Sequence, residues 1–258
     1  MKRLYYFARA VGIEPIHTLL FFYYFPDYIR DYIELRKQIK NYPDFKIHNY
    51  YPILWEKYLT SGAMSGHYFH QDLRVARRIF LNKPEKHVDI GSRIDGFVAH
   101  VAVFRKIEVF DIRPQNSKVK NIVFRQADLM KIPSKFINYC DSISSLHAIE
   151  HFGLGRYSDP INANGHKIGL DNIYKILKHG GRFYLSVPIG KQRIDFNAHR
   201  VFNIAYLLKL VEKKYKIDNF SYVDDNGNFH ENILLTKAKV ASNFNCYYGC
   251  GLLEMIKI

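Results

Sequence analysis

The 258-residue sequence has little of what marks several large protein classes, beginning with cysteine. It holds three, Cys140, Cys246 and Cys250, and none of them forms a Cys-x-x-Cys pair. This scarcity excludes a disulfide framework and is typical of a protein in a reduced compartment. Cys246 and Cys250 could ligate a metal, but no second pair completes such a site, so the sequence predicts no metal centre.

Long apolar runs are also missing. The best candidate, Ile16 to Phe25, is interrupted directly by Pro26 and Asp27, whereas a spanning helix needs about 20 apolar residues. No clear small-residue cleavage site follows it, so we expect a cytoplasmic protein. The aromatic residues of this run predict a cap packed on the core, and peripheral contact with an anionic membrane surface is the alternative.

Acidic residues are few beside the basic ones. There are 24 Asp and Glu against 38 Lys and Arg, a formal net charge of +14. Such a charge favours anionic partners, for example a phosphorylated or nucleotide-linked substrate. The basic residues are scattered rather than clustered, which argues against a nucleic-acid partner.

The chain divides into two parts by pattern. Residues 1–80 have no alternation of strands and helices, and apolar spacing predicts helices over 27–40 and 69–81 with a Tyr- and Pro-rich loop over 41–52. We therefore expect a helical, aromatic N-terminal cap over 1–80 and a second domain over 81–258.

Short apolar strands alternate with helices after residue 86. The pattern predicts strands over 87–90, 108–112, 122–126, 142–145, 182–187, 220–223 and 247–256, and helices over 98–104, 170–177 and 203–214. Alternation of this kind predicts an α/β fold, with a mostly parallel sheet covered by helices on both faces.

The segment His87 to Gly96 (HVDIGSRIDG) is the most informative part of the chain. It is typical of a buried strand that runs into a glycine turn, and a second strand-like run ends at Asp111, about 20 residues later. A glycine lets the backbone approach a ligand, and the second acid can accept hydrogen bonds from a ribose diol. Together they predict a nucleotide or nucleoside pocket.

Five blocks resemble, in order, the class I S-adenosylmethionine-dependent methyltransferases. They are VDIG (88–91), VFD (109–111), QADL (126–129), DSISSLHAIEH (141–151) and LKHGG with FYLSVP (177–188). The resemblance implies a Rossmann-like, seven-stranded, mostly parallel sheet with S-adenosylmethionine as the cofactor.

The resemblance also implies a set of cofactor-binding residues. Asp111 would bind the ribose hydroxyls, and Asp128 would lie near the adenine amine. Asp89 would organise the loop around the methionine end of the cofactor. Arg93 departs from the family pattern, which has glycine there; it could crowd the cofactor or pair with its methionine carboxylate. The full set is Asp89, Gly91, Arg93, Asp111, Ile112, Asp128, Leu129 and His147.

Three segments carry a closer similarity. HVDIGSRIDGFVAH, SLHAIEHFGLGRY and VPIGKQRIDFNAHRVF are similar to a family catalogued as a domain of unknown function in bacteria and nematodes. Its bacterial relatives are associated with surface polysaccharide synthesis. This implies O-methylation of a sugar or phosphoryl group in a capsule or lipopolysaccharide precursor.

Methyl transfer to a hydroxyl needs an oriented acceptor and a base, and neutral histidine suits that role near pH 7. The loops after the fourth and fifth strands hold the candidates, since ligands bind at the carboxyl ends of parallel strands. We predict His151 or His199 as the base, with Glu150 orienting a partner. The predicted acceptor-binding residues are Arg156, Tyr157, His166 and Arg200.

Two alternatives remain open at this point. His147 to His151 (HAIEH) matches the H-x-x-E-H pattern of zinc hydrolases, which needs both histidines on one helical face. The other alternative is a binding module that kept the sheet but lost cofactor affinity through Arg93. The oligomeric state is not predicted.

Overall fold

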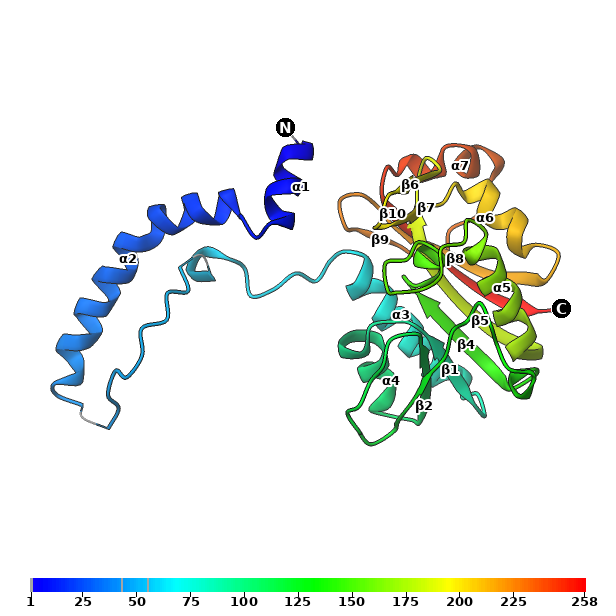
Figure 1. Ribbon diagram of the computed structural model, residues 1–258, viewed down its shortest axis with the longest axis horizontal. Helices are drawn as coiled ribbons and strands as arrows, with labels where there is room; N and C mark the ends of the chain where they lie inside the picture. The colour runs from blue at the N-terminus through cyan, green and yellow to red at the C-terminus, as the bar shows by residue number, and fades with distance from the viewer. Residues whose placement is uncertain (1, 43, 55) are drawn as a thin grey trace. The chain divides into compact units, whose positions relative to one another are not determined.

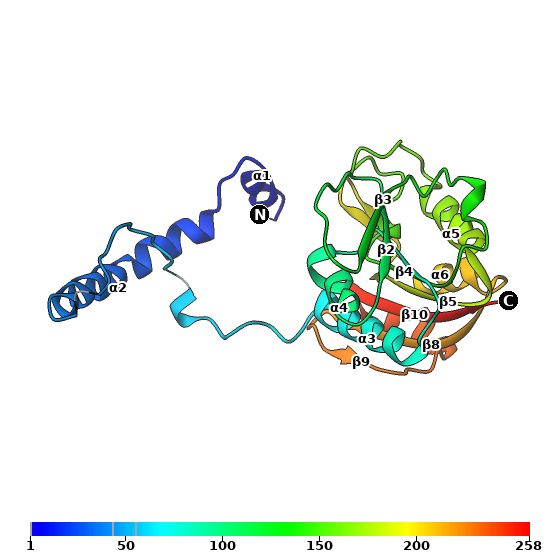
Figure 2. The same ribbon diagram turned by 90° about the horizontal axis from the view of Figure 1, so that it is seen from below.

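The computed structural model describes residues 2–42, 44–54 and 56–258, and the chain forms two compact units that divide between Ala63 and Met64. Figures 1 and 2 show the helical first unit and the α/β second unit from two directions.

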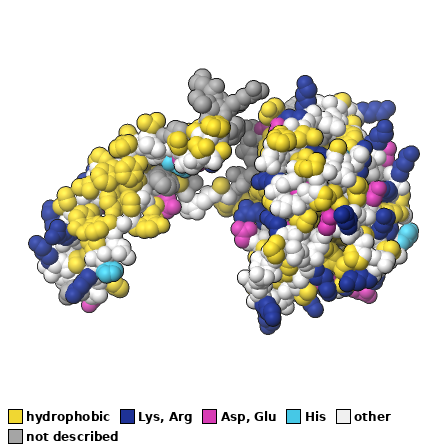
Figure 3. Space-filling view, in the orientation of Figure 1, with side chains coloured by type: hydrophobic (Ala, Val, Ile, Leu, Met, Phe, Trp, Pro, Cys, Tyr) yellow, Lys and Arg dark blue, Asp and Glu magenta, His cyan; other side chains and the backbone are white. Residues whose placement is uncertain are grey.

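The first unit consists of two helices and a long irregular segment. α1 spans Lys2–Ala10, α2 spans Pro15–Ile39, and a 3-10 turn covers Glu56–Tyr58. α2 begins earlier than the predicted helix because Pro15 suits the first helical turn, and it continues through Pro26. Many of its apolar side chains are exposed, as Figure 3 shows along the helix. No helix in the described part of the chain is both long and apolar enough to cross a membrane.

The second unit is built on one eight-stranded sheet with the order β3-β2-β1-β4-β5-β10-β8-β9. β1 to β5 are parallel, and β10 runs antiparallel to both of its neighbours. The strands are β1 His87–Ile90, β2 Ile107–Asp111, β3 Ile122–Gln126, β4 Cys140–Leu146, β5 Leu177–Ile189, β8 Tyr215–Val223, β9 Phe229–His230 and β10 Gly249–Lys257. The predicted α/β sheet is confirmed, and β9 is an eighth strand too short for a sequence signal.

Helices cover both faces of this sheet. One apolar cluster joins Ile173 and Leu207 to strand residues such as Ile143, and the other joins Ile79 and Val101 to the opposite face. The helices are α3 His67–Asn82, α4 Ala99–Ala102 with the preceding π turn Ile94–Val98, α5 Gly165–Ile176, α6 Ile204–Val211 and α7 Lys237–Ala241, and a small hairpin joins β6 Arg193–Asp195 to β7 His199–Val201.

α3 belongs to the second unit, so the units divide at 63/64 rather than at the expected 80/81. Its Val75 and Ile79 are buried in the sheet domain. Arg74 and Arg78 each donate to Glu254 on β10, at 2.9 and 2.5 Å, and that carboxylate is buried. The sequence pattern missed this because the partners of α3 lie about 180 residues away.

Candidate active site

The carboxyl ends of the parallel strands carry two adjoining cavities. The first cavity lies beyond β1, β2 and β4 and is lined by Ile90, Gly91, Phe110, Asp111, Ile112, Arg113, Ala127, Asp128, Leu129, Met130, His147, Ala148, His151, Phe152, Tyr157 and Asp159. The second cavity is lined by Tyr68, Gly91, Arg93, Arg113, His147, Glu150, His151, Arg156, Tyr157, Ala198, His199 and Tyr248. The two cavities adjoin, because five of the described residues line both of them: Gly91, Arg113, His147, His151 and Tyr157.

The turn after β1 forms the floor of the first cavity. Gly91 has a φ of +67°, and a Cβ there would lie 3.1 Å from the Cβ of Ala148, so a side chain would be strained and crowded. Asp89 holds the turn closed: its carboxylate accepts from the Ser92 and Ser144 hydroxyls, both at 2.6 Å, and from the Ser92 amide at 3.0 Å.

Asp89 itself is fully buried and does not line either cavity. Its hydrogen bonds organise the glycine turn beside the first cavity, which is the loop-organising role that the sequence favoured for it. Burial raises the pKa of Asp89 to about 6, against the lowering effect of its hydroxyl donors.

Arg93 lines the second cavity and is absent from the lining of the first. Its guanidinium donates to Asp95 at 3.1 and 2.8 Å and lies 4.9 Å from the ring centroid of Tyr68. Arg93 therefore does not narrow the first cavity. The next glycine in the chain, Gly96, is required by packing, because a Cβ there would lie 2.5 Å from the Asp72 carboxylate on α3.

Asp111 and Asp128 both face the first cavity, as the sequence predicted. Asp111 accepts from Arg113 through the backbone amide at 2.8 Å and the guanidinium at 3.0 and 2.6 Å. The Arg113 guanidinium also lies 4.5 Å from the Tyr157 ring centroid, which links the loop after β2 to the loop after β4. Asp128 accepts from the Met130 amide at 2.8 Å. Ile112 and Leu129 are part of the same lining.

His151 and His199 meet in the second cavity, with ring centroids 6.4 Å apart. The Nδ1 of His151 lies 2.6 Å from the Ala198 carbonyl, which can only accept, so Nδ1 carries the proton and Nε2 holds the free lone pair. His199 Nε2 lies 3.4 Å from the Asp195 carboxylate. Burial lowers the pKa of both histidines, which keeps them neutral near pH 7.

His147 and Glu150 form a buried pair on the wall between the cavities. His147 Nδ1 lies 2.7 Å from Glu150 Oε1, and His147 has a φ of +51°. Burial lowers the pKa of His147, but Cys250 and Glu150 beside it raise that pKa well above its ordinary value. Within the described residues, His147 Nε2 has no hydrogen-bond partner.

The zinc-hydrolase pattern is not realised here. Only a single 3-10 turn, Ile149–His151, follows β4, so His147 and His151 do not share a helical face. Glu150 Oε1 instead lies 2.7 Å from Nδ1 of His147.

Arg156 and Tyr157, two of the predicted acceptor-binding residues, line the second cavity. Arg156 also donates to the Ala198 carbonyl at 3.0 Å. Their side chains lie where an acceptor could be reached.

Arg200 is a correction to the sequence prediction. Its buried guanidinium donates to the carbonyls of Glu150, Phe152 and Ala163 at 3.3, 2.6 and 3.3 Å. All of these bonds serve the loop after β4, and Arg200 lines neither cavity. Its place in the structure is therefore that of a support for this loop.

His166 is the second such correction. It lies on α5, where its Nε2 is 2.8 Å from the Tyr206 hydroxyl and its ring packs against Phe202. It lines neither cavity, because α5 turns it into the layer between α5 and α6.

Sequence reasoning missed Tyr68, Arg113 and Tyr248, which line the second cavity. A cation two residues after the strand-end Asp111 was a local signal for Arg113. Tyr68 and Tyr248 have no such signal, since α3 and the segment before β10 reach the site only through the tertiary fold.

Comparison with solved structures identifies the fold. The 1,6-didemethyltoxoflavin-N1-methyltransferase of Burkholderia thailandensis, solved with S-adenosylhomocysteine, matches with a TM-score of 0.51 and 14% identity over 72% of this chain and 78% of that one. A putative sarcosine dimethylglycine methyltransferase of Galdieria sulphuraria matches with a TM-score of 0.51 and 12% identity over 72% and 85%. The [4+2]-cyclase SpnF matches with a TM-score of 0.51 and 14% identity over 73% and 80%.

These likenesses define the class: the second unit has the Rossmann-like fold of the class I methyltransferases. At this identity they show the fold alone, and the cyclase among them shows that the fold also carries other chemistry.

The family is defined by sequence. The family model described as "Caenorhabditis protein of unknown function, DUF268" matches residues 101–245, more than half of the chain, so this protein belongs to the DUF268 family. The matched region includes Asp111, Asp128 and the histidines of the second cavity. A comparison with curated proteins found no match.

Proposed function

We propose that this protein is an S-adenosylmethionine-dependent methyltransferase that methylates a hydroxyl oxygen of an anionic acceptor. The observation that carries the proposal is one cavity that joins the Gly91 turn, Asp111 at the end of β2 and Asp128 beyond β3. Ligands of doubly wound sheets bind at these strand ends, and a strand-end acid suits a ribose diol.

The lining of the first cavity suits the cofactor through two acceptor carboxylates and a glycine turn. The absent side chain at Gly91 leaves room for close backbone approach, since a Cβ there would already touch Ala148. Asp111 would accept from the ribose hydroxyls, and Asp128 would accept from the adenine amine. When bound, S-adenosylmethionine supplies an electrophilic methyl group.

Arg113 must adjust for this binding mode. An ionised carboxylate offers about four lone-pair sites, and Arg113 uses three of those on Asp111. Two ribose hydroxyls therefore need the guanidinium to withdraw from at least one oxygen. The Tyr157 ring, 4.5 Å from the guanidinium, can hold Arg113 after such a bond is lost.

The second cavity supports an anionic acceptor. Arg93, Arg113 and Arg156 face it, and Glu150 is the one carboxylate among its lining residues. His151 Nε2 would take the proton of the acceptor hydroxyl, with Nδ1 held by the Ala198 carbonyl. A phosphorylated sugar or another glycan precursor combines the required hydroxyl and charge.

The test is calorimetric titration of the full chain with S-adenosylmethionine and S-adenosylhomocysteine, using Asp111→Ala. The matched control is Asp171→Ala on α5, which also removes an aspartate paired with a cation, Lys214, but lies outside both cavities. We expect binding by the wild type and the control and its loss in Asp111→Ala. Absence of binding by folded wild-type protein, or equal binding by both variants, would overturn the proposal.

A further inference from the structure

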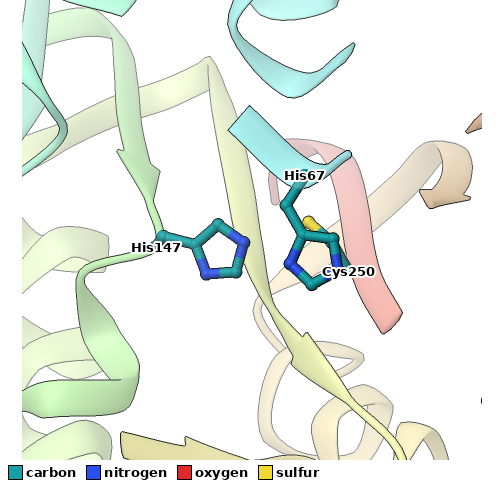
Figure 4. Close-up of side chains that lie close together, drawn as sticks. All are labelled: His67, His147 and Cys250. Atoms are coloured by element: carbon teal, nitrogen blue, oxygen red, sulfur yellow. The ribbon is translucent and has the colours of Figure 1, made fainter. Parts of the chain in front are cut away.

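Three potential metal ligands from distant parts of the sequence meet beside the second cavity. His67 is the first residue of α3, His147 directly follows β4, and Cys250 is the second residue of β10. Their candidate ligand atoms all lie within 4.8 Å of one another. Figure 4 shows the rings of His67 and His147 facing each other, with the sulfur of Cys250 close to the ring of His67.

The topology of the sheet explains this meeting. β10 is antiparallel to β5, so its amino-terminal end lies at the same edge as the carboxyl ends of β4 and β5. Cys250 pairs with Pro188, and the His147 amide donates to the Ser186 carbonyl at 3.0 Å, two residues earlier on β5. The buried Gln71 of α3 then accepts from the Ser186 hydroxyl, which brings His67, one turn earlier, over this edge.

His147 is oriented as a metal-binding histidine usually is. Its Nδ1 is engaged by the Glu150 carboxylate at 2.7 Å, and Nε2 is buried with no hydrogen-bond partner among the described residues. Histidine ligands commonly donate their second nitrogen to a carboxylate, which fixes the ring and leaves the other nitrogen for the metal. A buried polar atom without a partner is otherwise costly, by about 1–3 kcal/mol.

Cys250 differs from the other two cysteines in its surroundings. Cys140 and Cys246 belong to the apolar core cluster, whereas Cys250 is not a member of either apolar cluster. Its Sγ lies 3.7 Å from the Gln71 side-chain oxygen and next to two imidazoles. A buried thiol in a polar setting is a candidate ligand, while a thiol in an apolar core packs as a small hydrophobe.

We propose that His67, His147 and Cys250 bind one divalent transition-metal ion, with Zn²⁺ as the best match. One thiolate with two imidazoles suits zinc and other borderline metals and does not suit Mg²⁺ or Ca²⁺. A tetrahedral zinc site with bonds of about 2.0–2.3 Å requires donors roughly 3.3–3.8 Å apart. Donor atoms as far as 4.8 Å apart therefore need to approach one another by about 1–1.5 Å. Binding releases to solvent both the thiol proton of Cys250 and the second ring proton of His147, because each ligand atom must be deprotonated to bind the metal.

Three protein ligands leave the fourth tetrahedral position open, as in catalytic zinc sites. His147 lines both cavities, so water or an acceptor oxygen from the second cavity can complete the coordination. The ligand set differs from the H-x-x-E-H reading of the sequence, because Glu150 supports His147 and His151 takes no part.

The test is a titration of the metal-free full chain with Zn²⁺ alone, followed by elemental analysis, and with Co²⁺ followed by absorption. We expect one ion per chain and a near-ultraviolet thiolate-to-Co²⁺ charge-transfer band. His67→Ala and Cys250→Ala should lose the ion, while the controls His70→Ala and Cys246→Ala keep it; His70 lies on the same helix, stacked on Phe229.

Glu150→Gln serves as a further variant. Loss of a supporting carboxylate should weaken Zn²⁺ binding by about 10- to 100-fold without abolishing it. Zn²⁺ should also raise the melting temperature of the wild type and leave that of Cys250→Ala unchanged. Failure of folded wild-type protein to bind Zn²⁺, or retained binding in Cys250→Ala, would overturn the proposal.

Discussion

The two cavities share a wall but are assembled in different ways. The first takes its key groups, Gly91, Asp111 and Asp128, from the ends of three successive strands, β1, β2 and β3. The second takes side chains from α3, the loop after β4, the β6–β7 hairpin and the segment before β10. A site built from strand ends is determined by a local sequence pattern. A site built from distant loops can acquire a different ligand while the sheet stays the same.

The largest expected effect is a loss of catalytic rate in the second cavity without a loss of cofactor binding in the first. His151→Ala combined with His199→Ala should lower the rate of methyl transfer to a phosphorylated sugar acceptor by about 10²- to 10⁴-fold, the usual worth of a general base. Because burial lowers the pKa of His151, the acid limb of the wild-type rate profile should lie below pH 6.5.

Steady-state rates, together with calorimetry for S-adenosylmethionine, measure this difference. Cofactor affinity should persist in the double variant. Undiminished turnover would show that neither histidine is the base.

The next largest effect concerns stability and tests how Asp89 supports the glycine turn at the first cavity. The folded-state pKa of Asp89, about 6, lies above its ordinary value of 3.8, so its contribution to stability is complete below pH 3.8 and is lost as the pH rises through 6. Compared with Asp89→Asn, the wild type should lose about 3 kcal/mol of unfolding free energy across that window.

Urea denaturation of both proteins at several pH values measures this loss. A constant difference between wild type and Asp89→Asn from pH 4 to pH 7 would contradict the raised pKa.

A smaller effect on stability and cofactor binding is expected at the glycine turn of the first cavity. Gly91→Ala places a side chain at a φ of +67°, which should cost about 1–2 kcal/mol of stability. Gly180→Ala is the matched control, since its φ is +72° but no atom lies within 4 Å of its added Cβ. Both variants should be destabilised, and calorimetry should show weaker cofactor binding only for Gly91→Ala.

The smallest effect concerns charge in the second cavity. Arg156→Gln removes an exposed cation from its lining, so a phosphorylated acceptor should bind less tightly by about 0.2–1 kcal/mol, and less so at high salt. Arg182→Gln, which removes a cation paired with Asp218 outside both cavities, is the control. Equal acceptor KM values for the two variants would argue against an anionic acceptor.

Much of the first cavity could be predicted, because its residues follow buried strands whose apolar pattern is local. β1 and β3 lie where the alternation of strands placed them, and Asp111 and Asp128 face one cavity as expected. Asp89 has the loop-organising role that the sequence favoured, since its carboxylate accepts from Ser92 and Ser144 at the turn.

The second cavity was predictable only in part, because its loops fold by contacts between distant segments. Arg200 lies on β7 and His166 on α5, near the expected edge, yet Arg200 bonds to backbone carbonyls and His166 to Tyr206. Loop side chains near a site divide between support and ligand contact, and the sequence does not say which.

By itself, the sequence determined the parallel sheet, its glycine turn and the two strand-end acids, because hydrophobic alternation and strand-ending residues act over a few positions. Only the tertiary structure decided that α3 joins the sheet domain and that His67, His147 and Cys250 meet. That meeting depends on the antiparallel direction of β10, which brings residue 250 to the edge where residue 147 follows the end of β4. Burial of the apolar faces of the helices against the sheet holds these distant segments in place.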